Sequence, residues 1–260
     1  MTGPGATTPR ERYRAQVRAE VKEHAWEQIA TAGASALSLN AIAKQMGMSG
    51  PALYRYFAGR DELITELIRD AYRSVADAFR AAYEAHEATR AASGGSSEAD
   101  APGAGVAALA WTLREWALAD PHRYFLVYGT PVPGYHAPDE ITAIAAEMLG
   151  TLLDAYGAQP PEGGLTGAAG AEAPGGAGAE GGLPPDPFAA HLAEHRAWTA
   201  GHPAPPEILH QALSFWTRMH GVLSLELAGH FTGMGFDPAR LFAAELAGLT
   251  GPGTTRPPSN

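Results

Sequence analysis

The 260-residue sequence contains no cysteine. This absence excludes disulfide bonds and thiolate metal sites, and it is compatible with a reducing cytoplasm. No stretch has the roughly eighteen consecutive apolar residues that indicate a membrane span. Residues 1–14 (MTGPGATTPRERYR) lack the apolar segment of a secretory signal. We therefore expect a cytoplasmic protein without a membrane partner.

Motifs for catalysis and cofactor binding are also missing. The sequence has no Gly-x-Ser-x-Gly elbow, no phosphate-binding Gly-Lys-Ser/Thr and no dinucleotide fingerprint that follows a strand pattern. The glycine-rich tract at 163–182 lacks a lysine and a neighbouring strand pattern, so it is interpreted as a linker. His191 and His195 have a spacing that allows shared metal ligation, but no His-Glu-x-x-His arrangement accompanies them. We predict no enzymatic activity, no cofactor and no metal site.

The net charge of −10 is distributed unevenly along the chain. Residues 1–60 contain eight Lys/Arg and four Asp/Glu, which gives this segment a charge of +4 and leaves −14 for the other residues. A basic segment on an acidic chain favours contact with a polyanion, because the local field matters more than the total charge. An alternative reason for the acidic residues after position 60 is solubility alone, and both explanations can hold together.

Residues 38–57 (SLNAIAKQMGMSGPALYRYF) have the pattern of two short helices joined by a tight turn, the second over 50–57. Ser38 is a favourable N-cap, and Gly47 follows the first helix where a positive φ commonly ends one. Ser49 can cap the second helix, and Pro51 lies in its first turn, where a missing N–H is tolerated. Apolar residues at helical spacing give both helices an inward face: Leu39, Ile42, Ala43, Met46, Leu53 and Phe57.

The outward face of the second helix carries small residues first and then Tyr54, Arg55 and Tyr56, with no carboxylate. In a helix-turn-helix, the start of the second helix lies against base edges in the major groove. Tyrosine hydroxyls and guanidinium groups are suitable donors to phosphate oxygens. The spacing alone fits a plain helical hairpin with half-buried tyrosines as well.

The segment over about 18–67 resembles the DNA-binding domain of the tetracycline-repressor (TetR) family. Two departures from the family pattern are Pro51, which stiffens the start of the recognition helix, and Arg60, where the family usually has lysine. The resemblance rests on Ala25, Trp26, Gly33, the run Ser38 to Ala43, Gly47 to Ser49, Leu53 to Phe57 and Arg60 to Leu63.

This resemblance implies a DNA-binding site on the helix-turn-helix. The residues expected to contact phosphates are Ser38, Asn40, Lys44, Ser49, Tyr54, Tyr56 and Arg60. The residues expected to approach bases are Gly50, Pro51, Ala52 and Arg55.

The rest of the chain has a helical hydrophobic pattern, so an all-α protein is expected. The spacing predicts helices over 10–31, 61–86, 106–119, 139–156, 207–230 and 238–249, shorter ones after Pro121 and over 188–199, and a polar break at 89–105. Gly33 is expected to end the first helix, and Asp120 and Asp237 to cap the helices that follow them. The inward face of the first helix is expected to consist of Val17, Val21, Ala25 and Ile29, with His24 and Trp26 beside them. Low apolar content predicts disorder at 157–187 and in the tails 1–9 and 251–260. The expected domains are a three-helix DNA-binding domain (10–60) and a helical-bundle regulatory domain (61–250).

The second half is similar to the regulatory domain of a TetR subgroup named for a Trp-His-Gly motif. The similarity lies in residues 117–135 and 215–231, where His220 and Gly221 match and Met219 stands in the place of the tryptophan. Ordinary core packing is the favoured role of each bulky residue taken singly, but as a set some are expected to line an effector pocket. The candidate pocket residues are Trp111, Trp116, Tyr124, Tyr128, Phe215, Trp216, Met219 and His220.

The resemblance implies a ligand-responsive repressor that acts as a homodimer through the helices at 207–230 and 238–249. Its expected partners are a pseudo-palindromic double-stranded DNA operator and a small hydrophobic or aromatic effector that releases it. Two alternatives stay open. The chain is a transcriptional activator of the same family, or it is a small-molecule-binding protein or enzyme with an incidental helix-turn-helix.

Overall fold

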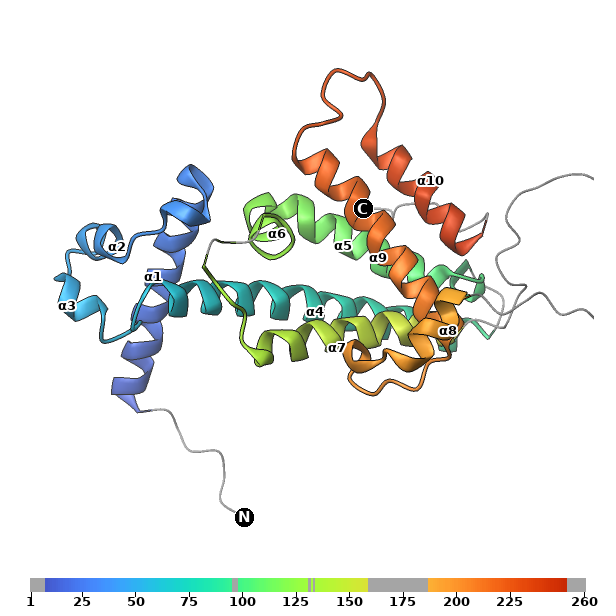
Figure 1. Cartoon of the computed structure of the whole chain (residues 1–260), viewed down its shortest axis with the longest axis horizontal. Coiled ribbons are helices and arrows are strands. Elements are labelled where there is room, and N and C mark those ends of the chain that lie inside the picture. Colours follow the sequence, from blue (N-terminus) through green and yellow to red (C-terminus); the bar gives the residue numbers. More distant parts are fainter. Residues whose placement is uncertain (1–7, 95–97, 131, 133, 159–186, 252–260) are drawn as a thin grey trace, which may run out of the picture. The chain divides into compact units, whose positions relative to one another are not determined.

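The computed structural model describes residues 8–94, 98–130, 132, 134–158 and 187–251. In these ranges every regular element is helical, which confirms the all-α prediction (Figure 1). The α-helices are α1 (Pro9–Ala32), α2 (Leu39–Gln45), α3 (Gly50–Leu53), α4 (Arg60–Ser93), α5 (Ala104–Ala119), α6 (Pro121–Tyr128), α7 (Asp139–Gly157), α8 (Pro187–Glu194), α9 (Pro206–Leu227) and α10 (Pro238–Thr250). Short 3-10 turns occur at Ala34–Ala36, Glu98–Asp100 and Ala197–Thr199.

The chain forms two compact units, and three of its helices run through both. The first unit comprises Met1–Ala76 and Glu115–Ala145, and the second comprises Asp77–Arg114 and Ala146–Asn260. The unit boundaries therefore fall inside α4, α5 and α7. No helix in the described residues is long and apolar enough to cross a membrane.

The first unit places α1, α2 and α3 around one apolar core. The inward face of α1 consists of Val17, Val21, Ala25 and Ile29, as the sequence predicts, and all four are buried. Two glycines end helices where they were expected, because Gly33 and Gly47 have φ of +79° and +66°. The same core includes Leu39, Ile42, Ala43, Leu53, Phe57, Leu63, Ile64 and Leu67.

The second helix of the helix-turn-helix is shorter than the predicted 50–57. Helix α3 ends at Leu53, and residues 54–56 form a turn. The amides of Arg55 and Tyr56 donate to the carbonyls of Ala52 and Leu53, three residues back, at 3.4 and 2.8 Å. Such bonds tighten the end of a helix. We call residues 54–56 the recognition turn.

Helix α4 is longer than the predicted 61–86, and the expected break at 89–105 is wrong over its first part. The helix continues to Ser93, and Gly94 follows with a φ of +61°. An ion pair between Glu87 and Arg90, one turn apart with 2.7 Å between nitrogen and oxygen, supports the added turns. Helix α5 then begins at Ala104, close to the predicted start.

In the second unit α9 packs against both α8 and α10. The predicted caps Asp120 and Asp237 are confirmed, because their carboxylates accept hydrogen bonds from the amides of Arg123 and Ala239. The helix expected at 188–199 is split into α8 and a 3-10 turn, and α9 ends at Leu227 rather than at 230. The segments 1–7, 159–186 and 252–260, which include most of the predicted disorder, lie outside the described residues.

Candidate nucleic-acid interface

Helix α2 is fixed at its start by hydrogen bonds around Ser38. The hydroxyl of Ser38 accepts from the amide of Ala41 at 3.3 Å, which confirms the predicted N-cap. The amide of Ser38 donates to Oε1 of Gln28 on α1 at 3.0 Å, so α2 is tied to α1 as well. The hydroxyl of Ser38 keeps its own hydrogen for an acceptor such as a phosphate oxygen.

The exposed side of α2 and α3 carries several of the predicted contact residues. Asn40 and Lys44 are exposed on α2, and Ser49 and Pro51 are exposed at the start of α3. Ser49 occupies the N-cap position of α3, but its side chain makes no capping hydrogen bond, so that expectation was wrong. Gly50 and Asn40 are close, since a Cβ on Gly50 would lie 3.2 Å from Oδ1 of Asn40.

The recognition turn presents its side chains to different degrees. Tyr54 is 47% exposed and Arg55 is exposed, whereas Tyr56 is half-buried against the core and Ala52 is half-buried on α3. Tyr54 and Arg55 therefore have side chains available to a DNA backbone or base. The hydroxyl of Tyr56 extends from a ring that also packs against the core.

Arg60 differs from the other candidates because its guanidinium has partners within the protein. Its Nη2 donates to the carbonyl of Ala34 at 2.9 Å, and its Nη1 lies 3.8 Å from the carboxylate of Asp61. Arg60 thus joins the start of α4 to the 3-10 turn after α1. A phosphate contact by Arg60 would have to coexist with these bonds.

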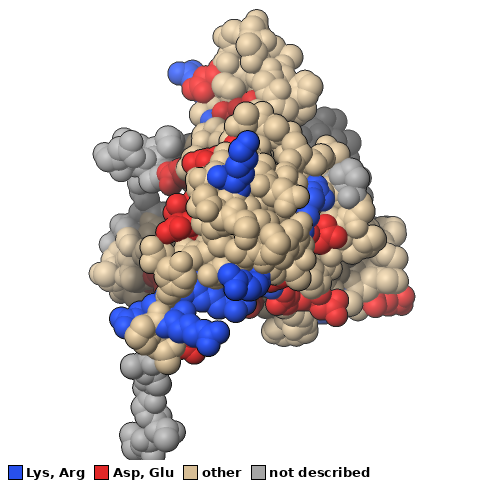
Figure 2. Space-filling model, turned by 90° about the vertical axis from the view of Figure 1, so that its left-hand side faces the viewer, with Lys and Arg blue, Asp and Glu red and all other residues tan. Residues whose placement is uncertain are grey.

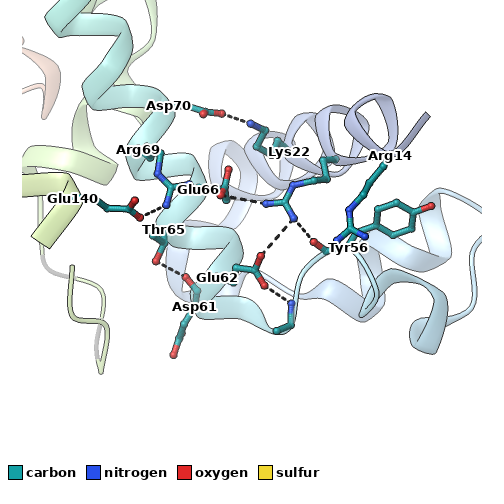
Figure 3. A network of polar contacts seen from close by, with 12 residues as sticks. Arg14, Lys22, Tyr56, Asp61, Glu62, Thr65, Glu66, Arg69, Asp70 and Glu140 are labelled. Carbon is teal, nitrogen blue, oxygen red and sulfur yellow. Dashed lines mark hydrogen bonds and ion pairs between the residues drawn. The ribbon is translucent and has the colours of Figure 1, made fainter. Parts of the chain in front are cut away.

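Sequence reasoning missed two arginines of α1 that hold the recognition turn (Figure 3). Nη2 of Arg14 donates to the carbonyl of Arg55 at 3.3 Å, and Nη1 of Arg18 donates to the carbonyl of Tyr56. Arg18 also pairs with Glu62 and Glu66 on α4. The sequence contains no signal for these contacts beyond the basic character of α1, because the partners are about forty residues apart.

Basic side chains gather on part of the face that contains this site. In Figure 2, lysine and arginine side chains form a cluster at the lower left, with few acidic side chains among them. The segment 1–60 supplies eight basic and four acidic residues. Such a local excess attracts nucleic acid even when the whole chain is acidic.

Three of the eight candidate pocket residues belong to an aromatic cluster in the first unit. The ring of Tyr128 lies 5.3 Å from that of Tyr124, 6.4 Å from that of Trp116 and 5.8 Å from that of Tyr72. Trp116 donates from Nε1 to the hydroxyl of Ser74 at 3.1 Å. Burial raises the pKa of Tyr128 well above its usual value, so this phenol stays neutral at physiological pH.

The other five candidates belong to the second unit. Phe215 and Met219 are fully buried on α9, and Trp111 of α5 packs on Phe242 of α10 with 5.3 Å between ring centroids. The rings of Trp216 and His220 are 4.2 Å apart. Burial lowers the pKa of His220 to about 3, so the imidazole is neutral above that pH.

Two hollows in the described residues lie elsewhere. One of about 440 Å³ is lined by residues of α1 and α2 that include Gln28 and Gln45, and one of about 100 Å³ lies beside His86 and Gly105. Neither hollow is lined by any of the eight candidate pocket residues. The rings of His191 and His195 are stacked 4.0 Å apart, and no group of three potential metal ligands occurs in the described part of the chain.

Comparison with known proteins identifies both halves of the chain. Residues 23–67 match the family described as bacterial regulatory proteins, tetR family, and residues 106–249 match the tetracyclin repressor-like C-terminal domain. The HTH-type transcriptional regulators Rv1816 of Mycobacterium tuberculosis and Mb1846 of Mycobacterium bovis are each 34% identical over 234 residues, which cover 89% of this chain and 90% of each relative.

Solved structures agree with this assignment. The crystal structure of SCO4313 has 60% sequence identity and a TM-score of 0.71, covering 94% of this chain and all of that chain. A protein of unknown function from Rhodococcus sp. RHA1 has 18% identity and a TM-score of 0.57, covering 95% and 97%, and shares the fold. The helix-turn-helix, the all-helical architecture and these relatives together show that the chain belongs to the TetR family of DNA-binding transcriptional regulators.

Proposed function

We propose that this regulator is a ligand-responsive homodimeric repressor that binds a pseudo-palindromic operator. The observation that carries the proposal is the exposure of Asn40, Lys44, Tyr54 and Arg55 on α2 and the recognition turn. These side chains are the donor types that bind phosphate and base edges. The proposal keeps the domain limits predicted from the sequence, 10–60 for DNA binding and 61–250 for regulation.

The DNA-contact assignment divides the residues by chemistry. Ser38, Asn40, Lys44, Ser49, Tyr54 and Tyr56 contact phosphates and fix the register, with Arg60 as a further contact at the start of α4. Gly50, Pro51, Ala52 and Arg55 lie at the bases. Small residues at the start of α3 allow close approach to the groove, and the Arg55 guanidinium matches the acceptors of guanine.

The homodimer is formed by α9 and α10 of each copy, packed as a four-helix interface. Support comes from apolar side chains exposed on this part of the chain, which include Leu225 on α9 and Met234 and Phe236 in the link to α10. A twofold dimer places two recognition turns on half-sites one or more helical turns apart.

The effector is a small hydrophobic or aromatic molecule that binds among the candidate pocket residues. Tyr128, Trp116 and Trp216 are half-buried, so a ligand could reach them with less rearrangement than it would need to reach the fully buried Phe215. Effector binding favours the state in which the two DNA-binding domains no longer match the operator spacing. The ligand thereby lowers the population of the DNA-binding state, and the protein leaves the operator.

Run-off transcription tests the repressor assignment. A duplex enriched by the wild-type protein from a random pool is placed across the promoter of a linear template, and the matched template carries a scrambled duplex. We expect the protein to lower transcription from the first template only, and added hydrophobic aromatic compounds to include one that restores it. Increased transcription from a template with the duplex upstream of the promoter, and no decrease from the first, would instead identify an activator.

A further inference from the structure

The guanidinium of Arg18 on α1 contacts the backbone of the recognition turn, and its partners Tyr56, Glu62 and Glu66 are labelled in Figure 3. Its Nη1 donates to the carbonyl of Tyr56 and lies 3.5 Å from Oε1 of Glu62. Its Nη2 lies 3.2 Å from Oε1 of Glu66. Its central carbon lies 4.1 Å from the ring centroid of the fully buried Phe57. One side chain therefore touches α4, the core and the recognition turn.

The carbonyl that Arg18 binds belongs to Tyr56, three residues after the end of α3. The last carbonyls of a helix accept no hydrogen bond from an N–H group of that helix. The recognition turn follows directly after α3, so its carbonyls bond to groups outside the helix. Arg14 supplies a second bond from α1, to the carbonyl of Arg55. Because α3 has only one turn of its own, these external bonds add to the local backbone bonds and core packing that hold Tyr54 and Arg55.

The partners of Arg18 are themselves fixed. Glu62 accepts a hydrogen bond from the amide of Ala58, and Glu66 also pairs with Arg69, which in turn pairs with Glu140 at the start of α7. Glu66 is largely shielded from solvent, with a side chain 20% exposed. A guanidinium held in this way keeps its geometry, since its planar fork matches two acceptors at once.

We propose that Arg18 is a positioning residue for DNA recognition: it holds the recognition turn against the start of α4 so that Tyr54 and Arg55 meet the DNA in register. The inference rests on the DNA-contact assignment proposed above. Arg18 itself does not contact DNA, because its donors are directed to Tyr56, Glu62 and Glu66. Its loss therefore impairs sequence selection more than general attraction to the phosphate backbone.

A neighbouring ion pair provides a matched control. Nζ of Lys22 lies 2.5 Å from Oδ2 of Asp70, so this pair also joins α1 to α4. The Lys22 and Arg18 side chains have the same exposure, 23%. Lys22 contacts Asp70 on α4 rather than the recognition turn. Lys22→Gln removes one positive charge and the single α1–α4 pair with Asp70 but leaves the turn in place, whereas Arg18→Gln removes one positive charge, two α1–α4 pairs and the bond to the turn.

The test measures the affinity of each variant for two duplexes by fluorescence anisotropy. One duplex is enriched from a random-sequence pool by the wild-type protein, and the other is a scrambled duplex of equal length. We expect Arg18→Gln to weaken binding to the enriched duplex by tenfold or more, on the order expected when several contacts are misplaced, and to weaken binding to the scrambled duplex by a clearly smaller factor. Lys22→Gln should change both affinities about equally and by a similarly small factor.

Arg18→Lys separates positioning from charge. A lysine keeps the charge but cannot reproduce the bidentate and stacked geometry, so we expect it to lose selection nearly as fully as Arg18→Gln. Equal weakening of Arg18→Gln on both duplexes, with full rescue by Arg18→Lys and a shallower dependence of affinity on salt, would identify a direct phosphate contact and overturn the inference. Behaviour of Arg18→Gln like that of Lys22→Gln would overturn it as well.

Two further measurements keep the result interpretable. Circular dichroism melting reports whether Arg18→Gln is folded. If it is not, Glu66→Gln replaces it, because this variant retains Arg18 and loses a partner that orients it; unchanged selection by Glu66→Gln then counts against the inference. A wild-type protein that enriches no duplex would contradict the proposed DNA-contact surface itself, which separates that failure from a failure of the Arg18 assignment.

Discussion

Arg114 of α5 and Glu226 of α9 form a shielded ion pair in the second unit, with 2.7 Å between Nη2 and Oε1. Their side chains are 8% and 15% exposed, and the Arg114 guanidinium lies 5.6 Å from the ring centroid of Phe242 on α10. Arg114 Nη1 and Glu226 Oε2 are buried and have no further hydrogen-bond partner in the described structure. The pair therefore links three helices at a cost in desolvation.

Removing one partner of this pair should destabilise the fold strongly. We expect Glu226→Gln to lower the free energy of unfolding by about 3–5 kcal/mol, because it leaves the Arg114 charge buried without its counter-charge. Urea denaturation at fixed protein concentration measures the change. Glu245→Gln is the control, since the Arg218–Glu245 pair is 3.9 Å apart with both side chains exposed, and its effect should be within about 0.5 kcal/mol. Similar effects of the two variants would contradict the account.

His220 should make the stability of the fold depend on pH. The residue as a whole is half-buried, but its Nε2 is shielded from solvent, and burial lowers the pKa of the imidazole to about 3 from an unfolded value of 6.5. Between these values the unfolded chain binds a proton that the folded chain does not. The stabilisation is therefore complete above pH 6.5 and is lost as the pH falls toward 3, with a slope approaching about 1.4 kcal/mol per pH unit.

Replacing this imidazole should remove its part of the slope. We expect His220→Gln to show a weaker fall in unfolding free energy between pH 6.5 and about 4.5 than the wild type. The control is His230→Gln, which removes an exposed histidine side chain. Parallel curves for wild type and His220→Gln in urea titrations across this range would show that the imidazole does not titrate as described.

The two tyrosines of the recognition turn, Tyr54 and Tyr56, should strengthen binding to DNA of any base sequence, because phosphate contacts do not read bases. We expect Tyr54→Phe combined with Tyr56→Phe to weaken binding to enriched and scrambled DNA alike, by about five- to tenfold for each phosphate hydrogen bond lost. The measurement is anisotropy titration at fixed salt. Tyr83→Phe, on the part of α4 within the second unit, is the matched control. Unchanged affinity of the double variant would remove both tyrosines from the contact surface.

The proposed dimer should depend on the apolar surface of α9. Leu225 is 45% exposed on α9, and we expect Leu225→Glu to shift the protein toward monomer because a carboxylate would be buried at the interface. Sedimentation should then report the chain mass of 27.1 kDa instead of twice that value for the wild type. Leu118→Glu on α5 is the control, with 43% exposure of the leucine. A monomeric wild type, or a dimer indifferent to Leu225→Glu, would refute this interface.

The features that the sequence predicted well are those encoded locally. Ser38, Asp120 and Asp237 cap helices through residues only two or three positions away, and Gly33 and Gly47 end them through their own φ. A capping hydroxyl or a glycine needs no distant partner, so the pattern along the chain is sufficient. The family resemblance added the function, which composition and spacing alone did not determine.

The features that escaped prediction depend on distant residues or on competing local signals. Arg18 meets Glu62 and Glu66 from 44 or more positions away, and no periodicity reports such a pair. Helix α4 runs past the predicted end because Ala-rich residues and the Glu87–Arg90 pair favour helix until Gly94. For the candidate pocket residues the sequence could not separate packing from ligand contact, since both use bulky apolar side chains.

The most direct test of the central claim is a titration of the wild-type protein against its enriched duplex and a scrambled duplex at two salt concentrations. The account predicts saturable binding that is at least about a thousandfold tighter for the enriched duplex, and affinities for both that fall steeply as salt rises because phosphate contacts release counterions. Equal affinity for the two duplexes, or affinity independent of salt, would contradict the assignment of α2, α3 and the recognition turn as a sequence-reading surface.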